Sequence, residues 1–393
     1  MLTARTYQLE VLTPVIIGGQ DKIQNFEFIR EGDNLRVVNF DKLFELSISK
    51  QGLLDTVVRA LETNPRTFRL NEVLEKYAID ANRVTRYRIK LDGVKGNANE
   101  IVAFIKSAGR AYIPGSSLKG AMRSFITKAL KDDFIKKYEE ALEKAGDKKF
   151  NTQDKKDKVN PQEVDNYPEN SIFQQPHFSP FKFLQVSDSE FVPYDRMCIY
   201  EIKVMNICNG NVKWYNSFNK GENFDNPQQG LSILAEGISP GTHISGKIKV
   251  DDGFVTGRQP VAGLKDKLSV AGENRGVEFL AKAINLASER YIIKELEFYQ
   301  KYKVTQIVAE YTKLLKLLKS LAPNQFLIQL GFSTGYLSKT VGMYFKKDSF
   351  EKLKIIMGEK SKIHKELFPK TRRVIFKNGA VSTIPGWVKV TIV

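Results

Sequence analysis

The chain has 393 residues, enough for two or more domains with cores of their own. Its 61 Lys and Arg residues outnumber its 45 Asp and Glu residues, giving a formal net charge of +16. Such a basic surface favours an acidic partner, most often nucleic acid, although a basic protein without that partner has the same composition. The two cysteines are too few for a disulfide framework or a zinc set, and we find no signal-like or membrane-spanning stretch. We therefore expect a cytoplasmic protein.

The positive charge is concentrated near one end. Residues 331–377 contain twelve Lys or Arg and only four Asp or Glu, so about half of the net charge lies in about an eighth of the chain. A concentrated patch indicates a binding face better than a diffuse excess does.

Hydrophobic periodicity predicts mixed elements in the first half of the chain. They are strands over residues 7–17 and 35–39, a helix that Asp41 caps and that runs through residue 61, a short helix over 70–78, and a long helix over 118–145. Residues 147–170 are rich in Lys, Asp, Asn and Gln and show no periodicity. We expect them to form a mobile insertion.

The second half repeats the order of strands, long helices and strands. Strands are predicted over 198–204 and 243–250, with a projecting hairpin over 209–230 between them. Helices over 273–299 and 303–321 follow, and then a strand over 326–330 and a basic helix over 349–357. Closing strands over 374–376 and 387–393 are joined through Asn378-Gly379. This order favours two α+β domains, which we place at residues 1–250 and 251–393.

An anion site is predicted where the helix over 118–145 begins. The extended residues 112–114 end at Gly115, two serines follow as candidate N-caps, and two cations lie in the first turns. Free backbone N–H groups, a glycine that permits close approach and a lysine together suit a phosphate. The candidate residues are Gly115, Ser116, Ser117, Lys119, Gly120 and Arg123. The alternative is that Gly115 only packs a tight turn that a serine caps.

This segment differs from a nucleotide-hydrolase loop. Gly115 and Gly120 have the two-glycine spacing, but Ala121-Met122 stands where the Lys-Ser/Thr pair would hold the terminal phosphate and Mg²⁺. We therefore expect no nucleotide or metal cofactor.

A second glycine segment lies in the basic region, between a predicted strand and a predicted helix. Its candidate nucleic-acid contacts are Gly331, Thr334, Gly335 and Lys339, and the basic pair Arg372-Arg373 follows. The alternative is that these glycines only form a tight turn.

No catalytic or metal site emerges from the remaining polar residues. His177, His243 and His364 stand in unrelated contexts, and no spacing links two of them into an acid–base pair. Trp214, Tyr215 and Phe218 could stack on bases, contact a neighbouring subunit or pack under their own hairpin. The sequence leaves these three roles open.

Four runs together resemble the RAMP superfamily of CRISPR RNA-binding proteins. Ile113-Pro-Gly-Ser-Ser-Leu-Lys-Gly-Ala-Met-Arg123 is similar to its signature, and Leu12-Thr-Pro-Val-Ile-Ile-Gly18 to its opening strand. Leu330-Gly-Phe-Ser-Thr-Gly-Tyr-Leu-Ser-Lys-Thr340 is similar to its C-terminal glycine loop, and Ile384-Pro-Gly-Trp-Val-Lys389 to the closing strand of one branch. The order of the four runs points to the branch at the head end of type III-A (Csm) effector complexes.

The resemblance implies two RRM-like (ferredoxin-like) α+β domains with helical insertions. It also implies a non-catalytic subunit that binds CRISPR RNA (crRNA) near its 3′ end, caps the filament of the repeating backbone RAMP subunit, contacts other Csm subunits, and supports 3′-end maturation by host nucleases. Two alternatives remain: a metal-independent RAMP endoribonuclease that cleaves repeat RNA with a histidine, and an assembly protein whose basic face meets an acidic partner.

Overall fold

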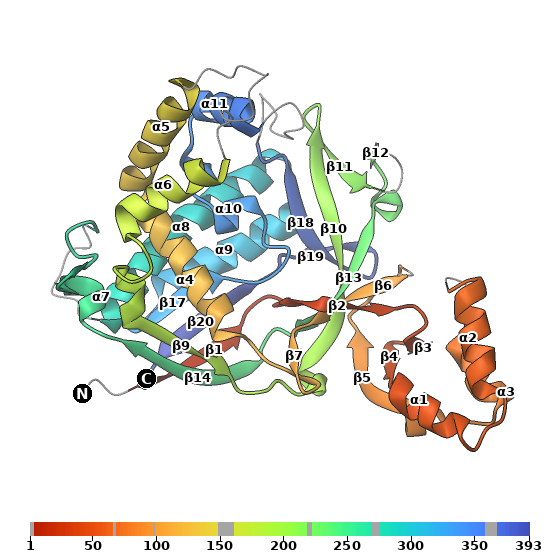
Figure 1. Cartoon of the computed structure of the whole chain (residues 1–393). Coiled ribbons are helices and arrows are strands. Elements are labelled where there is room, and N and C mark those ends of the chain that lie inside the picture. The colour runs from red at the N-terminus through yellow and green to blue at the C-terminus, as the bar shows by residue number, and fades with distance from the viewer. Residues whose placement is uncertain are drawn as a thin grey trace.

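The computed structural model describes residues 4–65, 68–96, 99–147, 161–217, 222–268, 276–357 and 368–393. Its mixed helices and strands confirm the α+β class. Two large sheets form the body, most helices gather beside the first sheet, and a small helical lobe projects at the opposite end (Figure 1). None of the described helices is both long and apolar enough to cross a membrane.

The first sheet has the strand order β17-β20-β1-β14-β9, and every neighbouring pair is antiparallel. Its strands are β1 (Arg5–Val11), β9 (Leu184–Ser189), β14 (His243–Val250), β17 (Gln325–Gln329) and β20 (Trp387–Ile392). Helix α4 (Gly115–Ala129) lies between β1 and β9 in the chain, and α8 (Val277–Lys301) lies between β14 and β20. The order β20-β1-β14-β9 is therefore that of a ferredoxin-like βαββαβ unit, with β17 added at one edge.

An aromatic cluster joins this sheet to its helices. Trp387 of β20 is fully buried, and its ring lies 5.9 Å from Tyr291 of α8 and 6.3 Å from Phe125 of α4, between centroids. On the neighbouring strand β1, Tyr7 and Leu9 are buried, with polar Gln8 between them exposed. This period of two places one face of the sheet against α4 and α8, which fixes the position of α4.

Within the described ranges, the second sheet has eleven strands. Seven lie in the order β2 (Gly18–Gln24), β6 (Glu100–Phe104), β13 (Ser232–Ile238), β10 (Met197–Cys208), β5 (Thr85–Leu91), β4 (Asn34–Val38) and β3 (Phe28–Glu31). Two hairpins attach to β10: β11 (Asn211–Asn216) with β12 (Glu222–Phe224), and β18 (Thr371–Lys377) with β19 (Ala380–Thr383). Smaller pieces are β7 (Lys106–Ser107), β8 (Arg110–Ala111), β15 (Gly257–Arg258), β16 (Val261–Ala262) and α7 (Gly253–Thr256).

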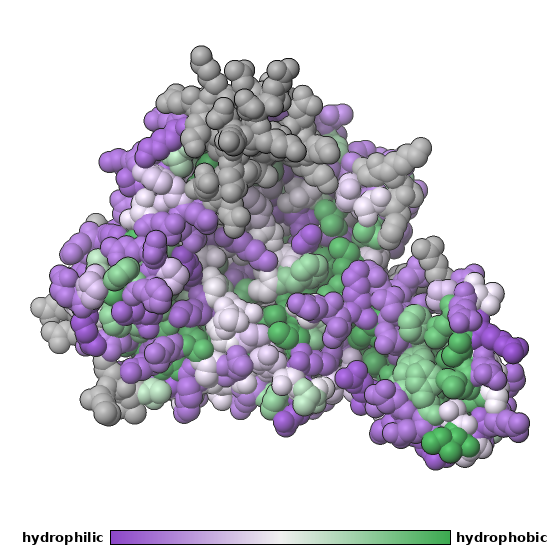
Figure 2. Space-filling model, in the orientation of Figure 1, coloured by the Kyte–Doolittle hydropathy of each residue, from purple (hydrophilic) through white to green (hydrophobic). Residues whose placement is uncertain are grey.

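The projecting lobe contains α1 (Phe40–Ser47), α2 (Leu53–Thr63) and α3 (Leu70–Lys76), around a small core of its own. The single helix expected from Asp41 to residue 61 is wrong, because Gly52 has a φ of 78° and separates two helices. Asn39, rather than Asp41, caps α1 and accepts a hydrogen bond from the Asp41 N–H at 3.0 Å. Figure 2 shows a hydrophobic patch on this lobe, where Ile48 is 90% exposed.

The long helix expected over residues 118–145 is two helices, α4 and α5 (Lys131–Asp147). Leu130 leaves helical geometry at a ψ of 30°, and the turn lets α5 bury Phe134 in the main core. The expected insertion at 147–170 is partly helical, because its second part belongs to helix α6 (Pro161–Phe173). Val164 of α6 packs against Leu142 of α5. Residues 148–160 lie outside the described part of the chain. The remaining helices are α9 (Thr305–Lys319), α10 (Tyr336–Lys339) and α11 (Lys347–Met357).

The closing strands do not pair with each other as expected. Asn378 and Gly379, at φ values of 53° and 80°, form the turn between β18 and β19, whereas β20 belongs to the first sheet. Each large sheet therefore takes strands from both sides of residue 250. The division into 1–250 and 251–393 stays a prediction about domains, and it does not follow the boundary between the sheets.

Candidate nucleic-acid interface

Gly115 begins α4 and packs it against β9. A Cβ atom at this position would lie 2.3 Å from the carbonyl oxygen of Val186, so only glycine fits. The Gly115 N–H donates to Oδ1 of Asp188 at 2.8 Å, which places a carboxylate at the positive end of the helix. The N-cap residue is Pro114, so neither serine caps the helix as expected. The packing role thus accounts for Gly115, and its N–H is already engaged.

Gly120, one turn later, has no such packing role. Apart from its chain neighbours and the nearby backbone of α4 itself, no atom lies within 4 Å of the position that its Cβ would occupy, and the residue is exposed. Glycine inside a helix costs about 1 kcal/mol relative to alanine, so the fold alone does not favour it here. A backbone that a ligand approaches closely explains this choice.

The second glycine segment is held firmly at its start. Gly331 has a φ of 97°, and a Cβ atom there would lie 2.3 Å from the carbonyl oxygen of Ile16. The Phe332 N–H donates to this same oxygen at 2.6 Å. Ser333 has a φ of 67°, a conformation that costs a residue other than glycine about 1–3 kcal/mol. The loop is thus fixed in a strained shape beside the segment that precedes β2.

Three runs that are far apart in the sequence interlock at this point. Besides the bond from Phe332 to Ile16, the Leu330 N–H donates to the Gly386 carbonyl at 2.9 Å. The Gly386 N–H in turn donates to the Pro14 carbonyl at 2.8 Å. The opening run, the glycine loop and the closing run that resembled one family therefore form one structural unit.

A cavity of about 810 Å³ lies where α4, the glycine loop and β2 meet. Its volume is within the range of about 300–1,000 Å³ of ligand pockets. The predicted residues that line it are Ser117, Gly120, Gly331, Thr334 and Lys339. The wall from β2 and β6 is mixed, since Lys22 pairs with Glu100 at 2.6 Å and Asp21 lies beside them. The cavity thus brings the two predicted glycine segments together.

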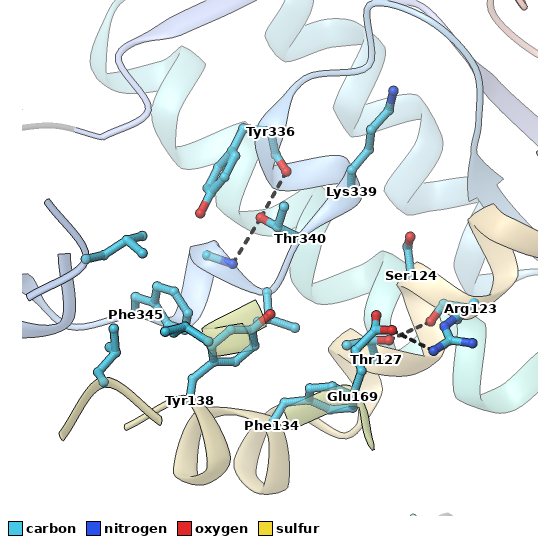
Figure 3. Close-up of a pocket in the computed structure, with 15 residues that line it drawn as sticks. Arg123, Ser124, Thr127, Phe134, Tyr138, Glu169, Tyr336, Lys339, Thr340 and Phe345 are labelled. Carbon is cyan, nitrogen blue, oxygen red and sulfur yellow. Dashed lines mark hydrogen bonds and ion pairs between the residues drawn. The ribbon is translucent and has the colours of Figure 1, made fainter. Parts of the chain in front are cut away.

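A second cavity, of about 490 Å³, adjoins the first and shares Ser124 and Lys339 with it. Figure 3 shows Arg123 and Thr127 of α4 at one side of this cavity and Phe134 and Tyr138 of α5 below it. The Lys339 side chain extends away from these aromatic rings. Arg123 is paired with Glu169 at 2.6 Å, so its charge is already partly balanced.

Three basic side chains in or beside the larger cavity have no acidic partner among the described residues. Lys339 lines the cavity, Lys119 precedes the lining residue Gly120, and Arg373 lies beside the lining residue Phe332. Partial burial, and then the charge of Arg123, lower the pKa of Lys119. Partial burial, and then the charge of Arg373, lower the pKa of Lys339. Burial also lowers the pKa of Arg373. An anion would relieve the repulsion between these cations, so the site is suited to phosphate.

The adjacent arginines of β18 have different roles. Arg372 is buried, and its Nε donates to Glu295 of α8 at 2.8 Å. Burial alone would lower the pKa of Arg372, but the Glu295 carboxylate, together with Tyr299 and Tyr291, outweighs it and raises the pKa. Arg373 is half-buried, and its guanidinium lies 5.3 Å from the centroid of the Phe332 ring. The RNA contact expected of Arg372 is thus not supported, because a carboxylate inside the protein neutralises it.

The sequence analysis did not identify Lys128 of α4 as a residue that shapes the site. It is fully buried, and its Nζ donates to the carbonyl oxygen of Ser338 in α10 at 2.6 Å. Burial lowers its pKa to about 7. The side chain therefore ties α4 to the end of the glycine loop. In the sequence, a lysine within a predicted helix does not indicate a buried contact. The one weak indication is its position three residues after Phe125, on the apolar side of α4.

The other predicted residues lie outside both cavities. Gly115, Ser116, Lys119, Gly335, Arg372 and Arg373 line neither one. His177 and His243 are exposed and also line neither cavity, and His364 lies outside the described residues. Trp214 is buried with its ring edge-on to Phe376 of β18 at 5.0 Å, so it packs inside the protein. Phe218 is not among the described residues.

A model of the RAMP superfamily matches residues 8–338 of the chain. The chain belongs to this superfamily. A curated relative from Methanocaldococcus jannaschii, named CRISPR system Cms protein Csm5, is 24% identical over 98% of this chain and 88% of its own length. A relative of the same name from Streptococcus thermophilus is 32% identical, over 31% of this chain and 38% of its own length.

Two solved structures share the RAMP fold seen here. One is a chain of a cryo-EM structure of a Csm–crRNA–target RNA ternary complex from a type III-A CRISPR–Cas system, with a TM-score of 0.70 and 21% identity over the whole of both chains. The other is the crystal structure of T. onnurineus Csm5, with a TM-score of 0.64 and 21% identity over 97% of this chain and 99% of the other.

Proposed function

We propose that the protein is a crRNA-binding subunit of a type III-A (Csm) effector complex in the cytoplasm. Its RAMP membership and its likeness to Csm5 proteins along nearly the whole chain support this proposal. In this role it contacts other Csm subunits, caps the filament of the repeating backbone subunit at the 3′ end of the crRNA, and supports 3′-end trimming by host nucleases.

The observation that carries the proposal is the meeting of two phosphate-suited segments at one cavity. Gly120 and Ser117 come from α4, and Lys339 comes from α10 more than two hundred residues later. A lysine without an acidic partner, such as Lys339, and an exposed backbone glycine, such as Gly120, contact phosphates without distinguishing bases. A site of this kind fixes the position of an RNA strand whatever its sequence, as a subunit that receives many different guides requires.

The salt dependence of RNA binding tests the proposal. Lys339→Ala and Lys119→Ala are each expected to weaken binding and to reduce the slope of log K against log salt by about 0.7 per lost phosphate contact. Lys42→Ala is the matched control, since Lys42 is an exposed lysine on α1, away from both cavities. Equal slopes for wild type and both site variants would contradict the proposed phosphate contacts.

We further propose that the subunit is non-catalytic. The exposed His177 and His243 line neither cavity and are not held by an acidic partner among the described residues, which speaks against an acid–base pair at the RNA site. Incubation of the purified protein with repeat RNA in EDTA separates this role from that of a metal-independent endoribonuclease. Cleavage that a single His→Ala change abolishes would establish the enzyme instead.

A further inference from the structure

The larger cavity has an apolar floor beside its polar wall. Val102 of β6, Ile233 of β13 and Phe332 of the glycine loop line it, and all three are partly buried against the same small apolar cluster. Phosphate contacts need only the polar wall that Ser117, Gly120 and Lys339 provide. The apolar floor therefore requires a separate explanation.

Phe332 is held in place before any ligand arrives. The preceding Gly331 and the following Ser333 both have positive φ values, of 97° and 67°, and the Phe332 N–H is bonded to the Ile16 carbonyl. The ring is half-buried, and Arg373 lies beside it at 5.3 Å from the centroid. A ring that is already fixed loses little conformational freedom when another flat group stacks on it.

A flat group next to a phosphate is what a nucleotide presents. Aromatic side chains beside a basic groove stack on unpaired bases with little regard to their identity, because every base has a π-face. The cavity, at about 810 Å³, is within the size range of pockets that hold small molecules.

We propose that this cavity receives one unpaired base of the bound RNA, stacked on Phe332, while the adjoining phosphate lies toward Lys339 and Gly120. This inference rests on the proposed RNA-binding function and specifies what part of the strand enters the cavity. It predicts that the strand is unpaired at this one nucleotide, since a base within a duplex cannot leave its stack freely.

The test combines Phe332→Ala with a series of single-stranded RNAs, each lacking one base at a different position. Binding to the full-length protein is measured by fluorescence anisotropy at several salt concentrations. For the wild type, removal of the base at one position is expected to weaken binding about 5- to 100-fold. Phe332→Ala is expected to weaken binding of intact RNA by a similar factor and to cause no further loss with that abasic RNA.

The salt slope distinguishes this inference from the proposed function. Phe332→Ala is expected to leave the slope unchanged, whereas Lys339→Ala reduces it. If Lys339→Ala reduces the slope and Phe332→Ala has no effect on affinity, the base site is overturned and the phosphate site stands. If the wild type binds none of the RNAs, the proposed function fails, and the base site fails with it.

The matched control is Phe191→Ala. Phe191 is also a surface phenylalanine with an arginine on its ring, because Arg110 lies 3.8 Å from its centroid, but it lines neither cavity. Phe332→Tyr keeps a stacking ring and is expected to bind as the wild type does, and thermal melting shows whether each variant folds. If Phe332→Ala reduces assembly with other subunits but not RNA affinity, the cavity holds a protein side chain and the inference is wrong.

Discussion

Lys128 and Ser338 connect two parts of the site that lie 210 residues apart in the sequence, through a hydrogen bond of 2.6 Å from Nζ to the backbone carbonyl oxygen. The contact is buried and has no charged partner among the described residues. It places α10, and with it Lys339, at a fixed distance from α4. The geometry of the cavity therefore depends on a side chain that does not line it.

The stability of the fold is expected to depend on pH through Lys128. Its pKa falls from 10.5 to about 7 on folding, so between these values the unfolded chain binds a proton that the folded chain does not. Stability therefore rises with pH from about 7 toward 10.5, by at most about 1.4 kcal/mol per pH unit, and this gain is lost as pH falls back to 7. Lys128→Met removes the effect, as urea unfolding from pH 6 to 9.5 can measure.

In the same variant the Ser338 carbonyl loses its donor, which costs about 1–3 kcal/mol. We expect RNA binding to weaken as well, because α10 is no longer tied to α4. Parallel pH profiles for wild type and Lys128→Met would show that Lys128 does not titrate in this range.

The two glycines of α4 are expected to respond in opposite ways to alanine. Gly115→Ala places a methyl group 2.3 Å from the Val186 carbonyl oxygen and is expected to destabilise the protein by about 1–3 kcal/mol. Gly120→Ala meets no neighbour and is expected to stabilise it by up to about 1 kcal/mol, while the added methyl group weakens RNA binding. Thermal unfolding and RNA titration of both variants check this pair, and an unchanged RNA affinity for Gly120→Ala would remove the functional explanation of that glycine.

We expect the two adjacent arginines to differ when each is replaced by alanine, with Arg372 affecting stability and Arg373 affecting RNA binding. Arg372→Ala leaves Glu295 buried without its partner and is expected to cost about 3–5 kcal/mol. Arg373→Ala breaks no ion pair among the described residues, so we expect little loss of stability and a weaker dependence of RNA binding on salt. Chemical denaturation and salt titrations of the two variants test this. A stable Arg372→Ala variant with a reduced salt slope would reverse the two roles.

The sequence predicted the local features of this fold better than the distant ones. The strand at 243–250 and the helices near 277–301 and 305–319 follow from hydrophobic periodicity, which neighbouring residues determine. The partner of β20 could not be predicted in this way, because its pairing with β1 is set by packing around Trp387. Asn378-Gly379 correctly indicated a turn, but the turn belongs to another hairpin.

The same limit applies to the candidate site. Both glycine segments were found from composition, yet the different roles of Gly115 and Gly120 depend on β9, which packs on only one of them. Arg372 and Arg373 look alike in sequence, and alternation along β18 points only the first toward Glu295. From the sequence, Lys128 cannot be distinguished from a solvated lysine, because its burial depends on the distant helix α10.

Strand β20 lies between β1 and β17, so the sheet beside α4 needs residues from nearly both extremes of the described chain. During synthesis, one edge of β1 has no partner until the ribosome has released the segment around Trp387. Pairing over such a sequence separation closes a large loop and is slow. A nascent chain therefore exposes one edge of β1 until the segment around Trp387 is made, and the sheet beside α4 is completed only then.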